Sequence, residues 1–250
     1  MRARPSSPRP RVSSPDWCSQ QDRLTFGVTF DLVRRYTLLV ASAVLTAATA
    51  LLLPVAGPVP NGSLGVASAA DCPDVEVVFA RGTDEAPGLG RIGNAFVNSL
   101  RNKVGGRSVG AYAVNYPASY DFLAAANGAN DASAHIQWMV NNCPATRLVL
   151  SGYSQGAAVI DVIAAVPFPA VGFNSPLPPN VPEHVAAVAV FGNPSAKLGL
   201  PLTASPVYGS RAIDLCNAND PVCTNGDSVP AHRAYEGPAD QAASFVAGLL

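Results

Sequence analysis

The feature that most constrains this chain is a serine placed between two glycines where two contrasting segments meet. Residues 148–150 belong to a short apolar run typical of a buried strand, and residues 155–163 have the pattern of a helix that begins with small residues. Gly152 and Gly156 lie two residues before and after Ser154. Glycine lacks the Cβ atom that would collide where a strand and a helix fold back on each other. The pattern therefore predicts a sharp turn that lifts the Ser154 hydroxyl clear of the sheet.

Two glycines around a serine also occur by chance in glycine-rich chains, so the motif alone is weak. Its place between a strand-like and a helix-like segment is the context that a nucleophilic serine requires. The N-terminus of the following helix adds positive potential beside any oxyanion that forms there. We therefore predict that Ser154 is a catalytic nucleophile.

Strand-like and helix-like runs alternate along residues 71–250, without an internal repeat or a domain break. We expect strands at 75–80, 109–116, 148–150, 185–191 and 212–215, and helices at 92–104, from Asp131 to about Asn142, from Ser154 to near Pro167, and at 239–250. Asp131 is expected to cap the second of these helices. Connections of this length predict an α/β fold, with a mostly parallel five-stranded sheet and helices on both faces.

Charge is distributed unevenly along the chain. Residues 1–70 carry seven Arg and three Asp, a net charge of +4, whereas residues 71–250 carry nine Lys and Arg and fourteen Asp and Glu, a net charge of −5. The second region is long enough to bury one hydrophobic core. Its mild acidity offers no basic surface to nucleic acid. We expect one folded domain, residues 71–250, that does not bind nucleic acid.

Residues 1–70 are interpreted as a polar leader followed by an export segment. An arginine pair precedes an apolar run from Tyr36 to about Val55, and small residues follow at 67–70. This order is typical of a secretory signal, so cleavage near Ala69 or Ala70 is expected. A permanent membrane anchor is the alternative, because about twenty apolar residues can span a bilayer. The leader is long for a signal sequence, which makes a later start of the chain, near Val28, a further alternative.

The cysteines also indicate an exported protein. Cys18 lies in the leader, and the other four, Cys72, Cys143, Cys216 and Cys223, predict two disulfides in an exported chain. Four cysteines allow three pairings, of which a short loop closed by Cys216 and Cys223 is the simplest. A zinc site is the alternative, but neither a Cys-x2-Cys pair nor clustered histidines support it, so no metal is expected.

Residues 88–93 (GLGRIG) match the G-x-G-x-x-G motif of dinucleotide-binding proteins. The preceding strand is expected to end near Ala80, so residues 81–87 intervene where the glycine turn should follow directly. No acidic residue ends the second strand to bind a ribose. We interpret the motif as a flexible loop that enters a helix, and we expect no cofactor.

A serine nucleophile needs a base and an orienting acid. Of the three histidines, His135 precedes the serine on a predicted helix, where a structural role is expected, and His184 precedes a strand at the opposite edge of the sheet. His232 follows the last strand in a loop. The chain order Ser…Asp…His selects His232 as the base.

The acid is predicted to be Asp220, which lies between Cys216 and Cys223 after the fifth strand. A carboxylate in a loop closed by a disulfide is held rigidly, as the orientation of an imidazole requires. Asp214 and Asp227 are the nearby alternatives. Asp214 lies within the strand, and turn propensity alone explains Asp227 in its Gly-Asp turn.

Residues 71–250 resemble the cutinase family, especially the secreted cutinase-like serine esterases of actinobacteria. The resemblance is carried by Phe79-Ala80-Arg81-Gly82-Thr83, Gly152-Tyr153-Ser154-Gln155-Gly156, Cys216-x3-Asp220-x2-Cys223 and His232. It implies a small α/β-hydrolase with a five-stranded, mostly parallel sheet and no large lid. It also implies a Ser154–His232–Asp220 triad and the disulfides Cys72–Cys143 and Cys216–Cys223.

Matched position by position, the resemblance implies an oxyanion hole made by the backbone N–H groups of Thr83 and Gln155, with the threonine hydroxyl helping to preorganise it. Each such donor lowers the barrier of acyl transfer by roughly 3–4 kcal/mol. The chain departs from fungal cutinases in its long leader and in Pro221. The proline is expected only to stiffen the loop that carries the acid.

The expected function is that of a serine esterase, secreted and possibly associated with the cell wall, that cleaves short-to-medium acyl esters, lipid esters or polyester, either in solution or at an interface. A monomer is expected. Two alternatives stay open, an acyltransferase on the same triad and a catalytically silent secreted binding or antigen protein. Apolar residues at 167–182, at 198–208 and at Val229-Pro230 are expected either to form a substrate-facing rim or to pack on the core.

Overall fold

The computed structural model describes residues 72–170 and 172–250, and within them five parallel strands form one sheet in the order β2-β1-β3-β4-β5. The strands are β1 (Val75–Ala80), β2 (Val109–Ala113), β3 (Arg147–Tyr153), β4 (Val185–Phe191) and β5 (Ala212–Leu215). The predicted export segment, cleavage site and Cys18 lie outside the described residues. This sheet confirms the predicted α/β-hydrolase class.

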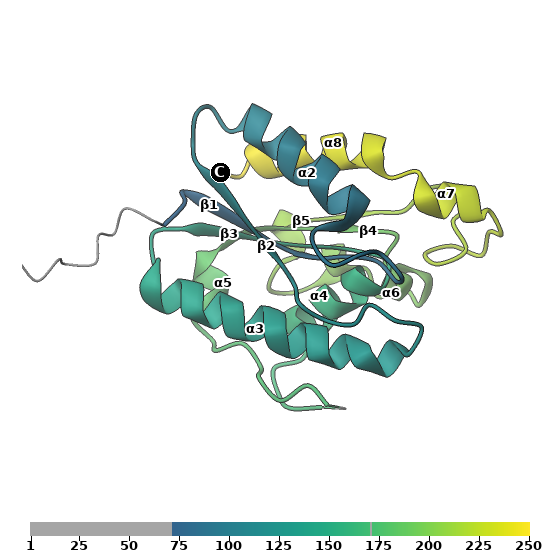
Figure 1. Ribbon diagram of the computed structural model, residues 1–250, viewed down its shortest axis with the longest axis horizontal. Helices are drawn as coiled ribbons and strands as arrows, with labels where there is room; N and C mark the ends of the chain where they lie inside the picture. Colours follow the sequence, from purple (N-terminus) through teal and green to yellow (C-terminus); the bar gives the residue numbers. More distant parts are fainter. Residues whose placement is uncertain (1–71, 171) are drawn as a thin grey trace, which may run out of the picture. The chain divides into compact units, whose positions relative to one another are not determined.

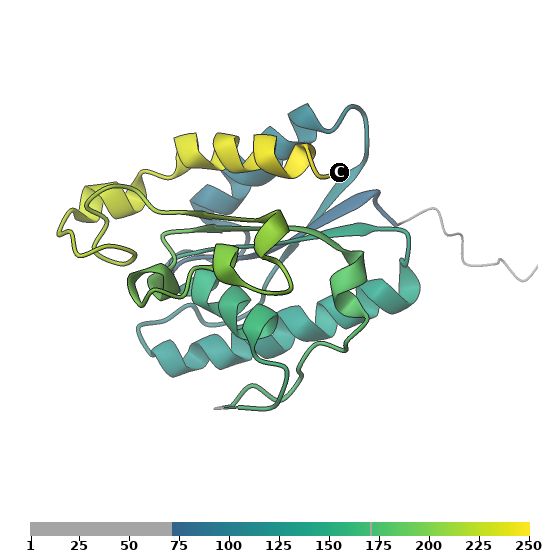
Figure 2. The ribbon, with the colours of Figure 1, turned by 180° about the vertical axis from the view of Figure 1, so that it is seen from behind.

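Helices cover both faces of the sheet, as expected for central strands that are apolar throughout. Helices α2 (Gly90–Lys103) and α8 (Glu236–Ala247) lie side by side on one face, and α3 (Ala125–Asn142) and α4 (Gln155–Ala165) lie on the other (Figures 1 and 2). Every residue of β1 and β4 is buried. Two hydrophobic cores result, one on each side of the sheet.

Short elements occupy the connections, and the sequence pattern indicated none of them. They are the helices α5 (Val181–His184), α6 (Pro194–Lys197) and α7 (Val229–Arg233) and the 3₁₀ turns η2 (Phe122–Ala124), η3 (Leu202–Ala204) and η4 (Gly209–Arg211). Among the described residues, no helix is both long and apolar enough to cross a bilayer.

The expected role of Asp131 was wrong. Helix α3 begins at Ala125, so Asp131 lies inside it, where its carboxylate accepts hydrogen bonds from the Tyr112 hydroxyl (3.0 Å) and the Asn115 N–H (2.8 Å). The second bond draws the chain away from the sheet, which explains why β2 ends at Ala113 and not at residue 116. Helices α2 and α8 also begin earlier than expected, by two and three residues.

Two disulfides tie the domain together. Cys72, just before β1, is bonded to Cys143 at the end of α3, and Cys216 is bonded to Cys223 in the loop after β5. The Cα atoms lie 5.6 and 5.9 Å apart, ordinary spacings for disulfides.

All five strands run in one direction, so their carboxyl ends meet at one edge of the sheet (Figure 1). The loop after β1, the start of α4, the loop after β4 and the segment that contains α7 all begin there. Open α/β sheets place their sites at this edge.

Candidate active site

Ser154 occupies the turn between β3 and α4 in a strained conformation. Its φ of 57° and ψ of −118° lie in a region that residues with side chains rarely adopt. The flanking glycines make this turn possible. A Cβ atom on Gly152 would lie 2.2 Å from the carbonyl oxygen of Gly156, and one on Gly156 would lie 1.9 Å from that of Ala80. The turn therefore has the predicted elbow geometry.

The structure brings the three predicted residues into one hydrogen-bonded chain. His232 Nε2 lies 2.9 Å from Ser154 Oγ, and His232 Nδ1 lies 2.7 Å from Asp220 Oδ2. His232 is on the short helix α7 and not in a loop as expected, with Ser228 capping the helix by accepting a bond from Ala231 N–H. An imidazole bonded in this way on both nitrogens can move a proton from the hydroxyl while the carboxylate fixes its tautomer.

Asp220 is fully buried. Burial raises the pKa of its carboxyl, but hydrogen bonds from the Tyr235 hydroxyl, from His232 and from the Val222 N–H outweigh this effect and leave the pKa below its usual value. The Tyr235 and Val222 bonds are both 2.7 Å long. The carboxylate is therefore held ionised without contact with bulk water.

Two tyrosines that sequence reasoning missed support this arrangement. Besides its bond to Asp220, the Tyr235 hydroxyl accepts a hydrogen bond from Asn217 N–H (2.9 Å). The Tyr153 hydroxyl donates to the backbone carbonyl of His232 (2.7 Å), and the two rings stack with centroids 5.1 Å apart. Tyr153 occupies an unspecified position of the Gly-x-Ser-x-Gly motif, and Tyr235 lies outside the motifs quoted above. Their only signal is sequence proximity to His232 and Ser154.

The alternative acids and bases lie in other surroundings. Asp214 accepts hydrogen bonds from Asn193 Nδ2 (2.9 Å) and Leu202 N–H (3.0 Å), and burial raises its pKa despite these two bonds. His135 contacts Glu76 and stacks on Tyr112. For Asp227 and His184, no contact with the Ser154–His232–Asp220 chain is found among the described residues.

The two predicted oxyanion donors face each other across the site. Thr83 follows β1, and its hydroxyl donates to the side-chain oxygen of Gln155 (3.3 Å). Gln155 is buried and its side-chain amide donates to Ser119 O (3.0 Å). As the first residue of α4, Gln155 has an N–H without an intrahelical acceptor. The Gln155 N–H, in the residue after Ser154, is therefore available, and the Thr83 side chain contacts the same glutamine.

The loop that carries Thr83 is held by a buried arginine. The Arg81 guanidinium donates to the carbonyl oxygens of Glu85 (2.9 Å) and Tyr116 (2.7 Å), and it is 4% exposed. The sequence analysis quoted Arg81 within a family motif but assigned it no role. Its bonds join the loop to the segment after β2.

Glu85 explains the dinucleotide-like motif. Its carboxylate accepts hydrogen bonds from Gly82 N–H (2.8 Å) and Arg91 N–H (3.0 Å), so it occupies the N-terminus of α2 where a bound phosphate would lie. A Cβ on Gly90 would meet this carboxylate at 2.5 Å. The motif therefore accommodates an internal carboxylate, and the loop, expected to be flexible, is held by these bonds.

Large apolar side chains are exposed in several loops. Phe168, Leu198, Leu200 and Val229, from the segments expected to form either a rim or core packing, are exposed, whereas Phe173, Leu202 and Tyr208 from the same segments are buried. Packing on the core is thus confirmed for part of the segments 167–182 and 198–208, and a substrate-facing rim stays a prediction. The most exposed set that the sequence analysis missed is Tyr120, Phe122 and Leu123.

Comparison with known proteins agrees with this geometry. Residues 71–250 match the family model described as Cutinase. The chain is 55% identical over 219 residues to phospholipase Culp4 of Mycobacterium tuberculosis, covering 87% of this chain and 92% of that protein. It is 52% identical over 197 residues to carboxylesterase Culp1 of Mycobacterium bovis, covering 74% and 86% of the two chains.

Solved structures are similar over the same region. A cutinase from Trichoderma reesei in complex with a phosphonate inhibitor has a TM-score of 0.59 and 33% identity, covering 71% of this chain and 77% of that one. The catalytic core of an acetyl xylan esterase from Trichoderma reesei has a TM-score of 0.59 and 28% identity, covering 72% and 100%. By sequence and by fold, the chain belongs to the cutinase family and is a serine ester hydrolase.

Proposed function

We propose that this protein hydrolyses carboxylic esters, including lipid esters, with Ser154 as nucleophile, His232 as general base and Asp220 as the orienting acid. The observation that carries the proposal is the continuous hydrogen-bonded chain from Ser154 Oγ through His232 to the buried Asp220. Its two distances, 2.9 and 2.7 Å, are within the range for proton transfer.

The reaction proceeds in two steps. His232 Nε2 takes the proton as Ser154 Oγ attacks the acyl carbon, and the tetrahedral oxyanion is bound by the N–H groups of Thr83 and Gln155. The C–O bond to the alcohol then breaks, and the alcohol leaves with the proton from His232. Water attacks the acyl-enzyme by the same route and releases the carboxylic acid.

Lipid substrates are favoured by two observations. One relative in the comparison is named a phospholipase and another a carboxylesterase. The exposed Tyr120, Phe122 and Leu123 follow Ser119, whose carbonyl is bonded to Gln155, so they lie close to the oxyanion donors. Apolar side chains beside the site favour esters with aliphatic acyl groups over esters with polar acyl groups.

We propose that the protein works outside the cytoplasm. Its two disulfides form and persist in oxidising surroundings. The apolar run at Tyr36–Val55, with small residues after it, would supply the export signal.

The decisive experiment compares Ser154→Ala with Ser210→Ala in the full chain. Ser210 is exposed and lies in η4, at the amino end of β5 and so at the opposite end of the strand from Asp220, which makes it a control for loss of a serine hydroxyl. The rate of p-nitrophenyl butyrate hydrolysis is expected to fall by roughly 10⁴- to 10⁶-fold in the first variant, with little change in melting temperature, and to stay unchanged in the second. Retained activity in Ser154→Ala would refute the assignment.

A transferase on the same residues is distinguished by its products. Glycerol added at increasing concentration to the p-nitrophenyl butyrate reaction competes with water for the acyl-enzyme. Butyric acid as the main product supports the hydrolase, and butyryl glycerol as the main product at low glycerol concentration would favour the transferase.

A further inference from the structure

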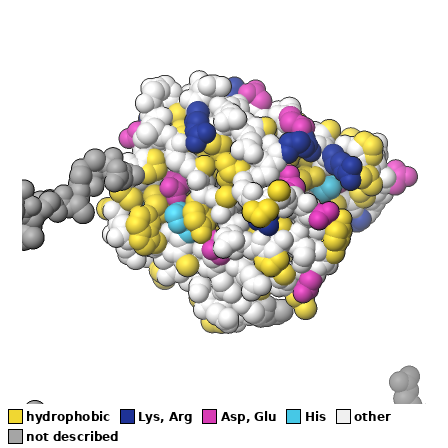
Figure 3. All heavy atoms as spheres, in the orientation of Figure 1, with side chains coloured by type: hydrophobic (Ala, Val, Ile, Leu, Met, Phe, Trp, Pro, Cys, Tyr) yellow, Lys and Arg dark blue, Asp and Glu magenta, His cyan; other side chains and the backbone are white. Residues whose placement is uncertain are grey.

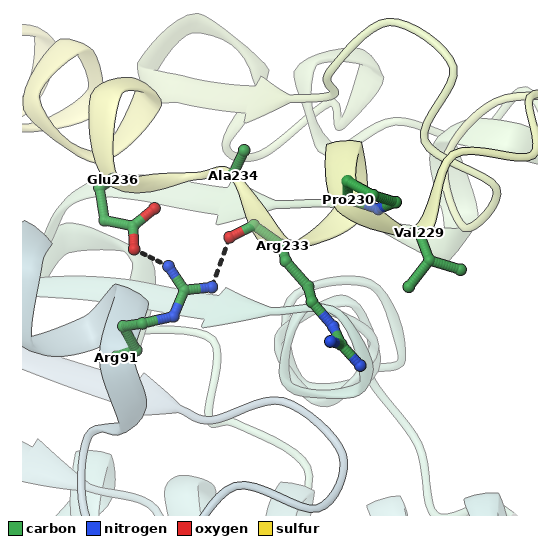
Figure 4. A pocket seen from close by; sticks show the side chains of 6 residues that line it. All are labelled: Arg91, Val229, Pro230, Arg233, Ala234 and Glu236. Atoms are coloured by element: carbon green, nitrogen blue, oxygen red, sulfur yellow. Dashed lines mark hydrogen bonds and ion pairs between the residues drawn. The ribbon is translucent and has the colours of Figure 1, made fainter.

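A hollow of about 500 Å³ opens beside the helix that carries His232. It is lined by Arg91, Val229, Pro230, Arg233, Ala234 and Glu236 (Figure 4). Four of these residues come from α7 and the residue after it, and the other two come from the first turns of α2 and α8. The hollow is therefore contiguous with the helix that positions the base, although the reaction derived above does not use it.

The two arginines of this hollow differ in their contacts. The Arg91 guanidinium forms an ion pair with Glu236 and a hydrogen bond to the carbonyl oxygen of Arg233. The Arg233 side chain extends away from its backbone into the space between Arg91 and Val229, and no dashed line reaches its guanidinium in Figure 4. Among the described residues, no hydrogen bond or ion pair involves that guanidinium. The charge of Glu236 is neutralised by Arg91. The charge of Arg233 is not, so the lining carries a net charge of +1.

The hollow is linked to the proposed base through the chain. Arg233 directly follows His232, and consecutive Cα atoms are about 3.8 Å apart. The bond from the Tyr153 hydroxyl to His232 O and the bond from Arg91 to Arg233 O hold this short segment on both sides. In the space-filling view, both basic and acidic side chains are exposed at the end of the molecule where α7 lies (Figure 3). While Ser154 attacks the ester carbonyl, the alcohol part of the substrate is still attached to the acyl group, so a charged group on that part can contact Arg233 only during this first step.

The lining combines apolar side chains with a positively charged one, a combination that suits esters of phospholipids. Val229 is half exposed and, with Pro230, gives an apolar wall opposite the guanidinium. Arginine binds phosphate through two parallel N–H···O bonds and is weakly hydrated, so it holds such anions well at a partly apolar surface. In a glycerophospholipid, the phosphate and the acyl ester share one glycerol, which places an anion a few bonds from the carbonyl that Ser154 attacks.

Building on the proposed esterase activity, we propose that this hollow is a subsite for the phosphate of a phospholipid substrate, with Arg233 as the residue that contacts it and Arg91 as the residue that positions Arg233. The substrate class is then glycerophospholipids, discriminated from neutral acylglycerols by this one charge.

The test compares two soluble esters with the same acyl chains, dihexanoyl phosphatidylglycerol and dihexanoylglycerol, in the full-length wild type and in Arg233→Gln. The measured quantity is the ratio of their two kcat/KM values. We expect the ratio to fall about tenfold or more in Arg233→Gln, mainly through KM for the phospholipid. The matched control is Arg107→Gln, an exposed arginine in the loop before β2, at the opposite edge of the sheet, which should leave the ratio unchanged.

A second arm separates a lipid phosphate from a free one. Inorganic phosphate is added to wild type and to Arg233→Gln hydrolysing p-nitrophenyl butyrate. An Arg233-dependent inhibition by phosphate, together with an unchanged substrate ratio, would make the hollow a free-anion site and overturn the headgroup assignment. An unchanged ratio without inhibition would overturn the subsite altogether. Absence of hydrolysis of any of these esters by the wild type would instead contradict the proposed function.

Discussion

Ser154, proposed as the nucleophile, and its two proposed partners are held in place by different means. Ser154 is positioned by its immediate neighbours, because β3, α4 and two glycines impose its backbone conformation. His232 and Asp220 lie in a segment without a long helix or strand, and contacts from elsewhere hold them, among them Tyr153, Tyr235 and a disulfide. The first half of the site is encoded locally in the backbone, and the second half depends on side chains that meet only after folding.

The largest effect is expected where the local backbone is altered. In Gly156→Ala the new methyl group would lie 1.9 Å from the carbonyl oxygen of Ala80, which cannot move without breaking the sheet. We expect loss of esterase activity and a decrease in unfolding free energy of about 3 kcal/mol or more. Calorimetry and p-nitrophenyl butyrate hydrolysis measure the two effects.

Gly237→Ala is the matched control for this change. It lies in α8 with open space around the added atom, so it should be neutral or stabilise by up to about 1 kcal/mol. Equal behaviour of the two variants would contradict the view that the elbow is limited by backbone contact.

Removing each disulfide separately tests the other half of the comparison. A double substitution, Cys216→Ser with Cys223→Ser, opens a loop of seven residues and should cost about 2 kcal/mol of stability, whereas Cys72→Ser with Cys143→Ser opens one of 71 and should cost about 4 kcal/mol. Activity should follow the opposite order, because only the short loop holds Asp220. Reduction of the Cys216–Cys223 bond should likewise lower activity before the domain unfolds.

Melting temperatures and kcat/KM values of the two pairs give the comparison. A greater loss of activity in the pair that lacks Cys72–Cys143 would count against a local role for the short loop.

Tyr235→Phe sharpens the comparison with a smaller change. The variant removes a hydrogen bond that lowers the pKa of Asp220 and leaves Asn217 N–H without its acceptor. We expect about a tenfold decrease in kcat/KM, and we expect activity to be lost at higher pH during acidification, because Asp220 then binds a proton more readily. The pH profile of kcat/KM measures both.

Tyr208→Phe controls for loss of a buried tyrosine hydroxyl, since no hydrogen bond of that hydroxyl is found among the described residues. A pH profile that stays the same in Tyr235→Phe would remove this tyrosine from the acid–base half of the site.

A last effect concerns stability alone and should leave the rate of ester hydrolysis unchanged. Burial raises the pKa of Asp161 to about 6, although hydrogen bonds with Ser195 and Asn193 act in the opposite direction. Because the folded state keeps this proton at a pH where the unfolded state has lost it, the contribution of Asp161 to stability is complete below about pH 3.8 and decreases as the pH rises to about 6.

Asp161→Asn should therefore become more stable relative to wild type across this window, by on the order of 3 kcal/mol. Chemical denaturation from pH 3.5 to 7 measures the difference. A difference that does not change with pH would show that Asp161 has an ordinary pKa.

Most of the sheet was predictable from the sequence, because buried parallel strands are continuous apolar runs. The bounds of β4 and β5 were predicted correctly. The start of α3 was not, since residues 125–130 contain Gly128 and two asparagines, which favour other conformations. In the structure Gly128 is buried where an added Cβ would meet Tyr116 and Val159 at 3.0 Å, so tertiary packing decides the helix there.

The same division applies to the site. A motif, a cysteine pair and chain order pointed to Ser154, Asp220 and His232, which the structure brings into one hydrogen-bonded chain. Tyr153, Tyr235 and Arg81 could not be identified in this way, since each acts through a carbonyl or carboxylate from a distant segment. Sequence reasoning found the groups proposed to react and missed those that hold them.

The order in which the site is built along the chain has a consequence for synthesis. The serine proposed as nucleophile precedes residue 191, whose carbonyl oxygen accepts a hydrogen bond from the serine N–H (2.9 Å), and its proposed carboxylate and imidazole partners come later still, from residues 220–232. A ribosome-bound chain would thus carry a nucleophile that nothing activates. The proposed hydrolysis of lipid esters could then begin only when translation of the domain is almost finished.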